Sequence, residues 1–284
     1  MRLLVPALAI AVSFAAPAQA PRLPSQELDP GITAVKDIPY VAEPVEPAKQ
    51  ALDVYRREGV RNAPVLIFIH GGAWVRGDRA QYPFLANRFA REGFVVVVPS
   101  YRLSPKYTHP AQIEDAAAAV AWTLRNIGRY GGDPKRVAAA GHSAGAHLAA
   151  LLATDPRWLN AHNAAPDRLR GVIGLSGVYD LTGLAGRAAG HVFGRDPDTL
   201  RAASPRHQLT AEAPPFLLTY CQFDYPSLPE QARDFHEAIR ALMRPSTLVH
   251  IPGETHITEI LSIVKDGDPT FRAMLDFLHQ AVRK

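Results

Sequence analysis

The sequence of 284 residues contains a single cysteine, Cys221. One cysteine cannot form an intramolecular disulfide, so the fold must be stabilised by an ordinary hydrophobic core and not by a disulfide framework. Because no cysteine lies near the N-terminus, lipid attachment there through a cysteine is excluded as well. The chain also lacks internal repeats, heptad runs and low-complexity blocks, which favours one ordinary globular domain.

Long runs of charge of one sign are also missing. The chain has 31 Lys and Arg against 27 Asp and Glu, a net charge of +4. The basic residues are scattered singly or in short pairs such as Arg56-Arg57, with no basic stripe or tail. This small surplus does not make a polyanion-binding surface, so nucleic acid is not expected as a partner.

The apolar run near the N-terminus, residues 3–16, is too short for a membrane-spanning helix, which needs about 20 residues. It follows Met1-Arg2 and leads into small residues that end at Ala20, as in a signal peptide. We therefore predict a signal peptide over residues 1–20, cleaved after Ala18 or Ala20. The protein would then be exported, either periplasmic or secreted, with no stable membrane insertion after cleavage. An uncut anchor is the alternative.

The segment that follows, residues 21–64, is rich in proline. Pro39, Pro44 and Pro47 cannot donate backbone hydrogen bonds, which disfavours helices and central strands. We predict that residues 21–64 form an extended N-terminal arm and that residues 65–284 form the catalytic domain.

From Val65 onward, short apolar runs alternate with helical patterns. Val65-Leu66-Ile67-Phe68-Ile69 is continuously apolar, as expected for a strand buried on both faces. Such alternation predicts an α/β fold, with a mostly parallel central sheet and helices on both faces. The further strands are expected at residues 94–98, 137–140, 172–175, 216–220 and 247–251, and the helices at residues 81–92, 111–127, 144–153, 229–243 and 270–282.

Chemistry in such sheets collects at the carboxyl ends of the strands, where three motifs lie. Gly141-His142-Ser143-Ala144-Gly145 fits G-x-S-x-G between a predicted strand and a predicted helix. The two glycines allow a tight turn that exposes the serine hydroxyl, which makes Ser143 the candidate nucleophile.

The second motif, His70-Gly71-Gly72-Ala73-Trp74, begins where the first buried strand ends. Small residues let backbone N–H groups approach a substrate oxygen closely. The amides of Gly71, Gly72 and Ala73, together with that of Ala144, are the candidate oxyanion donors. His70 itself is expected to make a structural hydrogen bond.

The third motif is an acid and a base, each of which follows a later strand. Asp224 follows the strand at residues 216–220, and His256 follows the strand at residues 247–251. His256 would take the proton of Ser143, and Asp224 would hold the imidazole in the right tautomer. Asp180, one strand earlier, is the competing acid.

These motifs resemble the esterase/lipase branch of the α/β-hydrolases, which includes hormone-sensitive-lipase-like carboxylesterases, acetyl esterases of the xylan-degrading kind and kynurenine formamidases. The resemblance runs from about Val65 to His256 and also rests on Ser100-Tyr101-Arg102-Leu103 and Gly132-Asp133-Pro134. It implies the order Ser143, Asp224, His256 for the triad. The chain departs from the family with H-G-G-A-W in place of H-G-G-G, and with no glycine before Asp224.

The expected function is carboxylesterase activity on small-molecule esters through an acyl-enzyme. An arylformamidase-type amidohydrolase is the alternative, and a non-catalytic binding protein of the same fold is a weaker one. No metal or organic cofactor is expected. Trp74, His142 and Tyr179 are candidate substrate-binding residues, and the long segment 176–214 is expected to be functional. A short lid favours a small, soluble ester. Trp158 and Phe193 could also line the pocket. The oligomeric state cannot be predicted.

Overall fold

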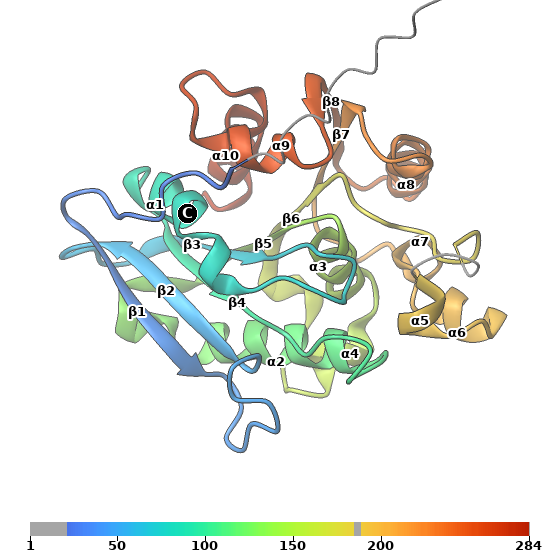
Figure 1. Ribbon diagram of the computed structural model, residues 1–284, viewed down its shortest axis with the longest axis horizontal. Helices are drawn as coiled ribbons and strands as arrows, with labels where there is room; N and C mark the ends of the chain where they lie inside the picture. The colour runs from blue at the N-terminus through green and yellow to red at the C-terminus, as the bar shows by residue number, and fades with distance from the viewer. Residues whose placement is uncertain (1–21, 185–188, 284) are drawn as a thin grey trace, which may run out of the picture.

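A computed structural model describes residues 22–184 and 189–283 of the chain. The predicted signal peptide, residues 1–20, lies outside the described residues. Within them the structure contains one eight-stranded sheet with the order β1-β2-β4-β3-β5-β6-β7-β8 (Figure 1). The pairs β1–β2 and β2–β4 are antiparallel, and the remaining pairs are parallel. The strands are β1 (Ile32–Pro39), β2 (Ala51–Arg57), β3 (Ala63–Ile69), β4 (Val95–Pro99), β5 (Gly132–His142), β6 (Leu169–Leu175), β7 (Phe216–Phe223) and β8 (Ser246–Thr255).

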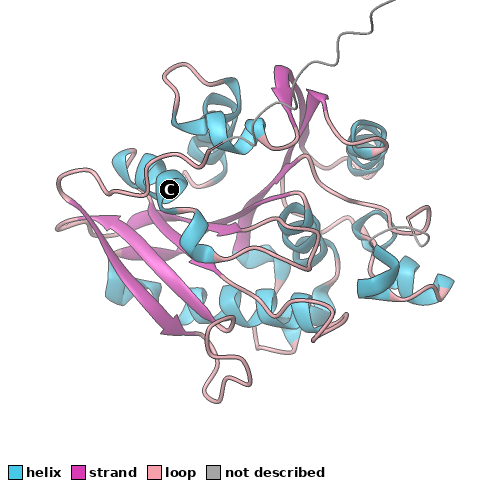
Figure 2. Ribbon diagram, in the orientation of Figure 1, coloured by secondary structure: helices cyan, strands magenta, loops and turns pink. Residues whose placement is uncertain are grey.

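Helices cover both faces of this sheet (Figure 2). In the view of Figure 1, α1, α9 and α10 lie above the sheet, and α2 and α4 lie below it. The α-helices are α1 (Pro83–Arg91), α2 (Ala111–Asn126), α3 (Ala144–Thr154), α4 (Pro156–Asn160), α5 (Ala189–Phe193), α6 (Pro197–Ala202), α7 (Pro205–Gln208), α8 (Leu228–Ala241), α9 (Thr258–Leu261) and α10 (Pro269–Ala281). Four 3₁₀ turns, counted over the described residues, are η1 (Arg79–Gln81), η2 (Ile127–Tyr130), η3 (Pro166–Arg168) and η4 (Ser262–Val264).

The core has two halves, one on each side of the sheet, because successive side chains of a strand point to opposite faces. In β4, Val95 and Val97 belong to the half that packs against α2, α3 and α8. Val96 and Val98 belong to the half that packs against α1 and α10. Burial on both faces explains why these strands are continuously apolar. The eight-stranded, mostly parallel sheet with helices on both faces agrees with the predicted α/β-hydrolase fold.

The N-terminal segment is where the structure corrects the sequence prediction most strongly. Residues 32–57 are not an extended arm but supply β1 and β2, the antiparallel edge of the sheet. Pro39 is accommodated because it is the last residue of an edge strand, where a missing amide donor is tolerated. Leu52 and Val54 are fully buried in the core, so residues 65–284 alone do not contain the whole domain.

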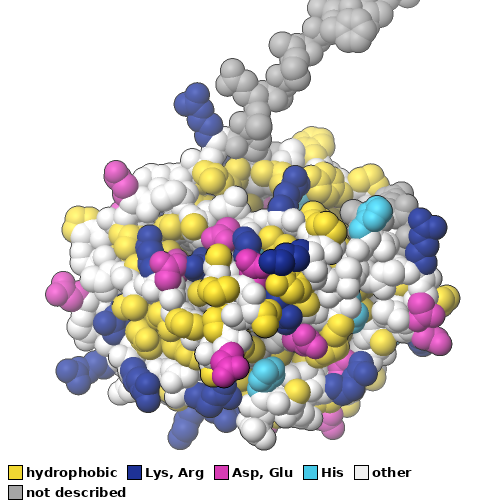
Figure 3. Space-filling view, turned by 60° about the horizontal axis from the view of Figure 1, so that its bottom comes forward, with side chains coloured by type: hydrophobic (Ala, Val, Ile, Leu, Met, Phe, Trp, Pro, Cys, Tyr) yellow, Lys and Arg dark blue, Asp and Glu magenta, His cyan; other side chains and the backbone are white. Residues whose placement is uncertain are grey.

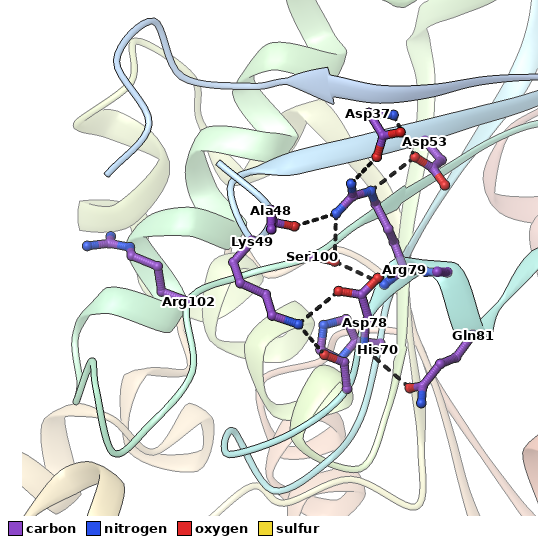
Figure 4. Close-up of polar contacts among 12 residues, drawn as sticks. Asp37, Ala48, Lys49, Asp53, His70, Asp78, Arg79, Gln81, Ser100 and Arg102 are labelled. Carbon is purple, nitrogen blue, oxygen red and sulfur yellow. Dashed lines mark hydrogen bonds and ion pairs between the residues drawn. The ribbon is translucent and has the colours of Figure 1, made fainter. Parts of the chain in front are cut away.

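Arg79 ties these two strands to the loop after β3 (Figure 4). Its side chain is 8% exposed, and its Nε lies 3.0 Å from Oδ1 of Asp53 on β2. The guanidinium also pairs with Asp37 on β1 and donates to the carbonyl of Ala48 at 2.6 Å. The amide of Arg79 donates to the hydroxyl of Ser100 at 3.0 Å. One buried cation therefore joins the edge of the sheet to the loop that carries the second motif.

The other predicted elements are present, with boundaries that differ by a few residues. The main difference is β5, which begins at Gly132, inside the Gly131–Pro134 segment that the sequence indicated as a break. Basic, acidic and hydrophobic side chains are intermixed on the face seen in Figure 3. In the described part of the chain, no helix combines the length and the apolar character needed to cross a bilayer.

Candidate active site

The turn between β5 and α3 holds Ser143 in a strained conformation. Its φ of 56° and ψ of −118° lie outside the regions that L-residues favour. A Cβ on Gly141 would come within 2.3 Å of backbone atoms of Gly145, and a Cβ on Gly145 within 2.0 Å of the Ile69 carbonyl oxygen. Both glycines of the G-x-S-x-G motif are therefore required sterically, as the sequence predicted. The turn projects the Ser143 side chain into a cavity.

The loop after β3 passes beside this turn. A Cβ on Gly71 would lie 3.4 Å from the Cβ of Ser143, so the two backbones are in close approach. Gly72 and Ala73 both have positive φ, 117° and 52°. Within the described residues, their amides donate to no protein acceptor. The amide of Ala144 is the first of α3, where no intrahelical acceptor exists. Three N–H groups near Ser143 are thus available to a developing negative charge.

His256 and Asp224 form a buried pair at the ends of β8 and β7. The Nδ1 of His256 lies 2.7 Å from Oδ1 of Asp224, with side chains 4% and 0% exposed. Because the carboxylate only accepts, Nδ1 carries the proton and Nε2 is left as a base. Burial would raise the pKa of Asp224, but hydrogen bonds from His256, Ser176 and the Cys221 amide outweigh it and hold that pKa below its ordinary value.

Two further contacts hold His256 in place. The Nε2 of His142 lies 2.8 Å from the His256 carbonyl oxygen, so His142 must carry its proton on Nε2. Burial and the nearby His256 lower the pKa of His142 to about 3, which keeps the ring neutral. The ring of Tyr225 stacks on His256 at 4.2 Å between centroids. His142, predicted to bind substrate, lines the cavity and also positions the loop of His256.

Ser143 and His256 line one cavity of about 310 Å³. Gly71, Gly72 and Ala73 form part of the same wall. The predicted nucleophile, the base and the oxyanion candidates of the loop after β3 therefore share one space, with Asp224 bonded to the base. The rest of the wall is largely apolar and includes Leu23, Tyr82, Phe84, Tyr225, Ile260 and Leu261.

Two predicted substrate-binding residues do not reach this cavity. Trp74 is 3% exposed and packs edge-on against His147 and Phe193. Tyr179 is fully buried and stacks on Phe235 at 4.6 Å. Both are core residues, since aromatic size alone does not distinguish a pocket wall from a core. None of the described residues of segment 176–214 lines the cavity, and neither does Trp158; residues 185–188 of the segment lie outside the described residues.

Asp180, the competing acid, lies elsewhere. Its carboxylate pairs with Nε2 of His207 at 3.1 Å and accepts from Thr182. Burial would raise its pKa, but the bonds from Thr182 and His207 lower it below the usual range. The structure thus places Asp224, and not Asp180, on His256. His70, as predicted, makes a structural bond, from Nδ1 to the Gly71 carbonyl at 2.7 Å.

Sequence reasoning missed Glu259. This carboxyl is fully buried on α9 and contacts the hydroxyls of Ser176 and Thr219. A lone acid three residues after His256, inside the apolar run Ile257–Val264, was the available signal. In the described segments, no cluster of three or more His, Cys, Asp or Glu side chains could hold a metal ion. The absence of a cofactor stays a prediction.

Comparison with known proteins identifies the family. The BD-FAE family model matches residues 52–239. Esterase LipC of Mycobacterium tuberculosis is 35% identical over 254 residues, which cover 82% of this chain and 63% of LipC. Esterase LipQ of the same organism is 35% identical over 262 residues, which cover 85% of this chain and 61% of LipQ. The chain thus spans about three-fifths of the length of these relatives.

A solved structure shows the same fold. A truncated carbohydrate esterase from gut microbiota superposes with a TM-score of 0.78 at 20% identity and covers 89% of this chain and 97% of its own. At that identity the likeness shows the fold alone. The family match covers well over half of the chain, and the sheet order and turn geometry agree with it. The chain belongs to the BD-FAE family, in the esterase/lipase branch of the α/β-hydrolases.

Proposed function

We propose that this protein is a carboxylesterase that cleaves small esters through an acyl-enzyme on Ser143. One observation carries the proposal. Ser143, in its strained turn, and His256 line the same cavity. Nδ1 of His256 lies 2.7 Å from Oδ1 of the buried Asp224. The names of LipC and LipQ as esterases support the same reaction class. They do not favour the formamidase alternative.

The proposed first half-reaction acylates the serine. Oγ of Ser143 attacks the ester carbonyl carbon as its proton passes to Nε2 of His256. Asp224 stabilises the transient imidazolium and keeps Nδ1 protonated. The imidazolium then gives its proton to the leaving alkoxide, and the alcohol departs. In the second half-reaction the same nitrogen takes a proton from water, which attacks the acyl-enzyme and releases the acid.

The charge of each tetrahedral intermediate falls on one oxygen. The amides of Ala144, Gly72 and Ala73 are the donors we assign to it, because they adjoin Ser143 and are not used within the described fold. Removing one such donor typically lowers turnover by roughly 10²–10³-fold. Ala73 thereby takes the place of the third glycine of the related H-G-G-G motif.

The size of the cavity supports a small substrate. About 310 Å³ lies at the lower end of the range for small-molecule sites, roughly 300–1,000 Å³. Its apolar wall suits a short acyl or aryl group, and its rim includes Tyr225, which is 52% exposed. We therefore expect activity to fall as the acyl chain is lengthened.

A panel of p-nitrophenyl esters of rising acyl length tests the proposal, with N-formylkynurenine as a formamide and acetylated xylan as a polymeric ester. Ser143→Ala should lower turnover by roughly 10⁴-fold or more. Ser246→Ala is the control, because Ser246 lies on β8 and does not line the cavity. Full ester cleavage by the folded Ser143→Ala variant would refute the proposal.

We also propose that the protein is exported. The charged start, short apolar run and small residues of positions 1–20 support this. Expression of the full sequence in a bacterial host, followed by fractionation and N-terminal sequencing, tests it. A mature N-terminus at Gln19 or Pro21 in the exported fraction is expected, whereas an intact cytoplasmic chain would contradict export.

A further inference from the structure

The hydroxyl of Ser176 lies between two carboxyl groups. Its Oγ is 2.7 Å from Oδ2 of Asp224 and 2.5 Å from Oε2 of Glu259. Ser176 follows β6 with a positive φ of 44°, an unusual conformation for serine. The Ser176 and Glu259 residues are fully buried, as is the Asp224 side chain.

The number of available protons restricts the total charge of Ser176, Asp224 and Glu259. A serine hydroxyl has one proton and can donate to only one of the two carboxyls. If both carboxyls were ionised, the other would face a lone pair of Ser176 at hydrogen-bond distance, with two negative charges in a buried site. Both contacts are satisfied only if one carboxyl supplies a proton of its own.

The surroundings decide which carboxyl is neutral. Asp224 accepts from His256, and also from the amides of Cys221 and Tyr225 at 3.1 and 2.9 Å. These donors stabilise its ionised form. In the described residues Glu259 has no basic partner, and its one further oxygen contact is the hydroxyl of Thr219.

The titratable groups that face Glu259 are Asp224, Cys221 and Tyr179, and none carries positive charge. His256 pairs with Oδ1 of Asp224, whereas Ser176 links the other oxygen, Oδ2, to Glu259. Burial raises the pKa of Glu259, and the Asp224 charge adds to this, against the opposing hydrogen bonds from Ser176, Thr219 and Cys221. Geometry and electrostatics therefore both favour a proton on Glu259.

We propose that Glu259 is a neutral carboxylic acid and a positioning residue for the triad. Its Oε2–H donates to Ser176, the Ser176 hydroxyl donates to Asp224, and Thr219 donates to Oε1. The proton on Glu259 fixes the direction of the Ser176 hydroxyl, so that Asp224 stays ionised and aligned with His256. The effect on catalysis rests on the proposed function, because it acts through Asp224.

Infrared spectroscopy tests the protonation state of Glu259 independently of any activity measurement. The spectrum of the full chain at neutral pH should contain the carbonyl band of a protonated carboxylic acid, distinct from carboxylate bands. Glu259→Gln should remove that band. Glu237→Gln is the matched control, because Glu237 is exposed on α8 and its replacement should remove carboxylate bands only. Loss of a carboxylate band in Glu259→Gln would overturn the proposal.

Kinetics tests the positioning role. In Glu259→Gln the amide can donate to Ser176 and accept from Thr219, so kcat should stay within about threefold of wild type, with the same pH profile. Glu259→Leu has similar volume but no donor, and kcat should fall by about tenfold at an unchanged KM, as for one lost buried hydrogen bond. Equal impairment of both variants, with both folded, would contradict the proposal.

The two proposals can fail separately. Ser143→Ala should lose ester cleavage and keep the protonated-acid band. If Ser143→Ala retained activity, the proposed function would be wrong, while the infrared result would still decide the state of Glu259. If Ser143→Ala were inactive but wild type lacked the band, only the neutral Glu259 would be refuted.

Discussion

Asp224→Asn is the substitution whose outcome can be worked out furthest from the structure. Oδ1 of Asp224 accepts from His256 and from the Tyr225 amide, and Oδ2 accepts from Ser176 and the Cys221 amide. An asparagine has one acceptor oxygen and one NH₂ group, so the NH₂ must replace one of these acceptors.

The two orientations differ in their cost. With the NH₂ in place of Oδ2, it would oppose the amide of Cys221, a residue that is only 1% exposed. With the NH₂ in place of Oδ1, it opposes the amide of Tyr225, a residue that is 52% exposed and can turn to water. A buried donor without a partner costs about 1–3 kcal/mol, so the second orientation should dominate.

The favoured orientation disables the base. The NH₂ would donate to Nδ1 of His256, which moves the ring proton to Nε2, the atom that has to accept the proton of Ser143. We expect kcat on p-nitrophenyl acetate to fall by roughly 10⁴-fold, with the free energy of unfolding in urea changed by less than about 1 kcal/mol.

Asp180→Asn is the control for this prediction, because Asp180 pairs with His207 outside the cavity. Its kcat should stay within about twofold of wild type. A folded Asp224→Asn enzyme that retained a tenth of the wild-type kcat would show that Asp224 does not set the tautomer of His256. A large loss in Asp180→Asn would point to the competing acid.

Three further outcomes concern stability. Gly145→Ala should be destabilised by about 3 kcal/mol or more in thermal or urea unfolding, since its Cβ meets backbone at 2.0 Å, whereas Gly128→Ala, with open space, should change by under about 1 kcal/mol. Arg79→Met leaves the buried Asp53 without its cation and should cost about 3–5 kcal/mol, so a change in Tm within error would contradict the pairing. Burial lowers the pKa of His147 to about 3, so its contribution is complete above the unfolded pKa near 6.5 and is lost as pH falls below it. Urea unfolding between pH 7 and 5 should show a slope of up to about 1.4 kcal/mol per pH unit from this residue, absent in His147→Gln.

Most of the parallel sheet could be predicted from the sequence, because its strands are buried on both faces and read as continuous apolar runs. Ser143 follows such a run directly, and His256 follows the half-exposed edge strand β8, so both lie at the carboxyl ends of parallel strands. Each strand and the residue that follows it can be identified from a few consecutive residues. The parallel sheet then brings the ends of these strands together.

What could not be predicted depends on pairing between distant segments. The place of β1 and β2 in the sheet is set by the ladders of β1 with β2 and of β2 with β4, and by the ion pair of Asp53 with Arg79. None of these leaves a local pattern. Trp74 and Tyr179 have the composition expected of a pocket wall, but packing placed them in the core. Glu259 depends on contacts with Ser176 after β6 and with Thr219 on β7, which no spacing rule encodes.

The antiparallel pair β1–β2 has a consequence for self-association. Without it, β4, with four consecutive valines, would be an exposed edge strand of the sheet. Such a strand readily pairs with a strand of another chain. The edge strand that is present instead, β1, carries Lys36 and Asp37, an irregular register after Val35 and a terminal proline. Each of these features hinders the addition of a further strand. A fragment that begins at Val65 should therefore aggregate, even though it would retain every residue of the cavity except Leu23.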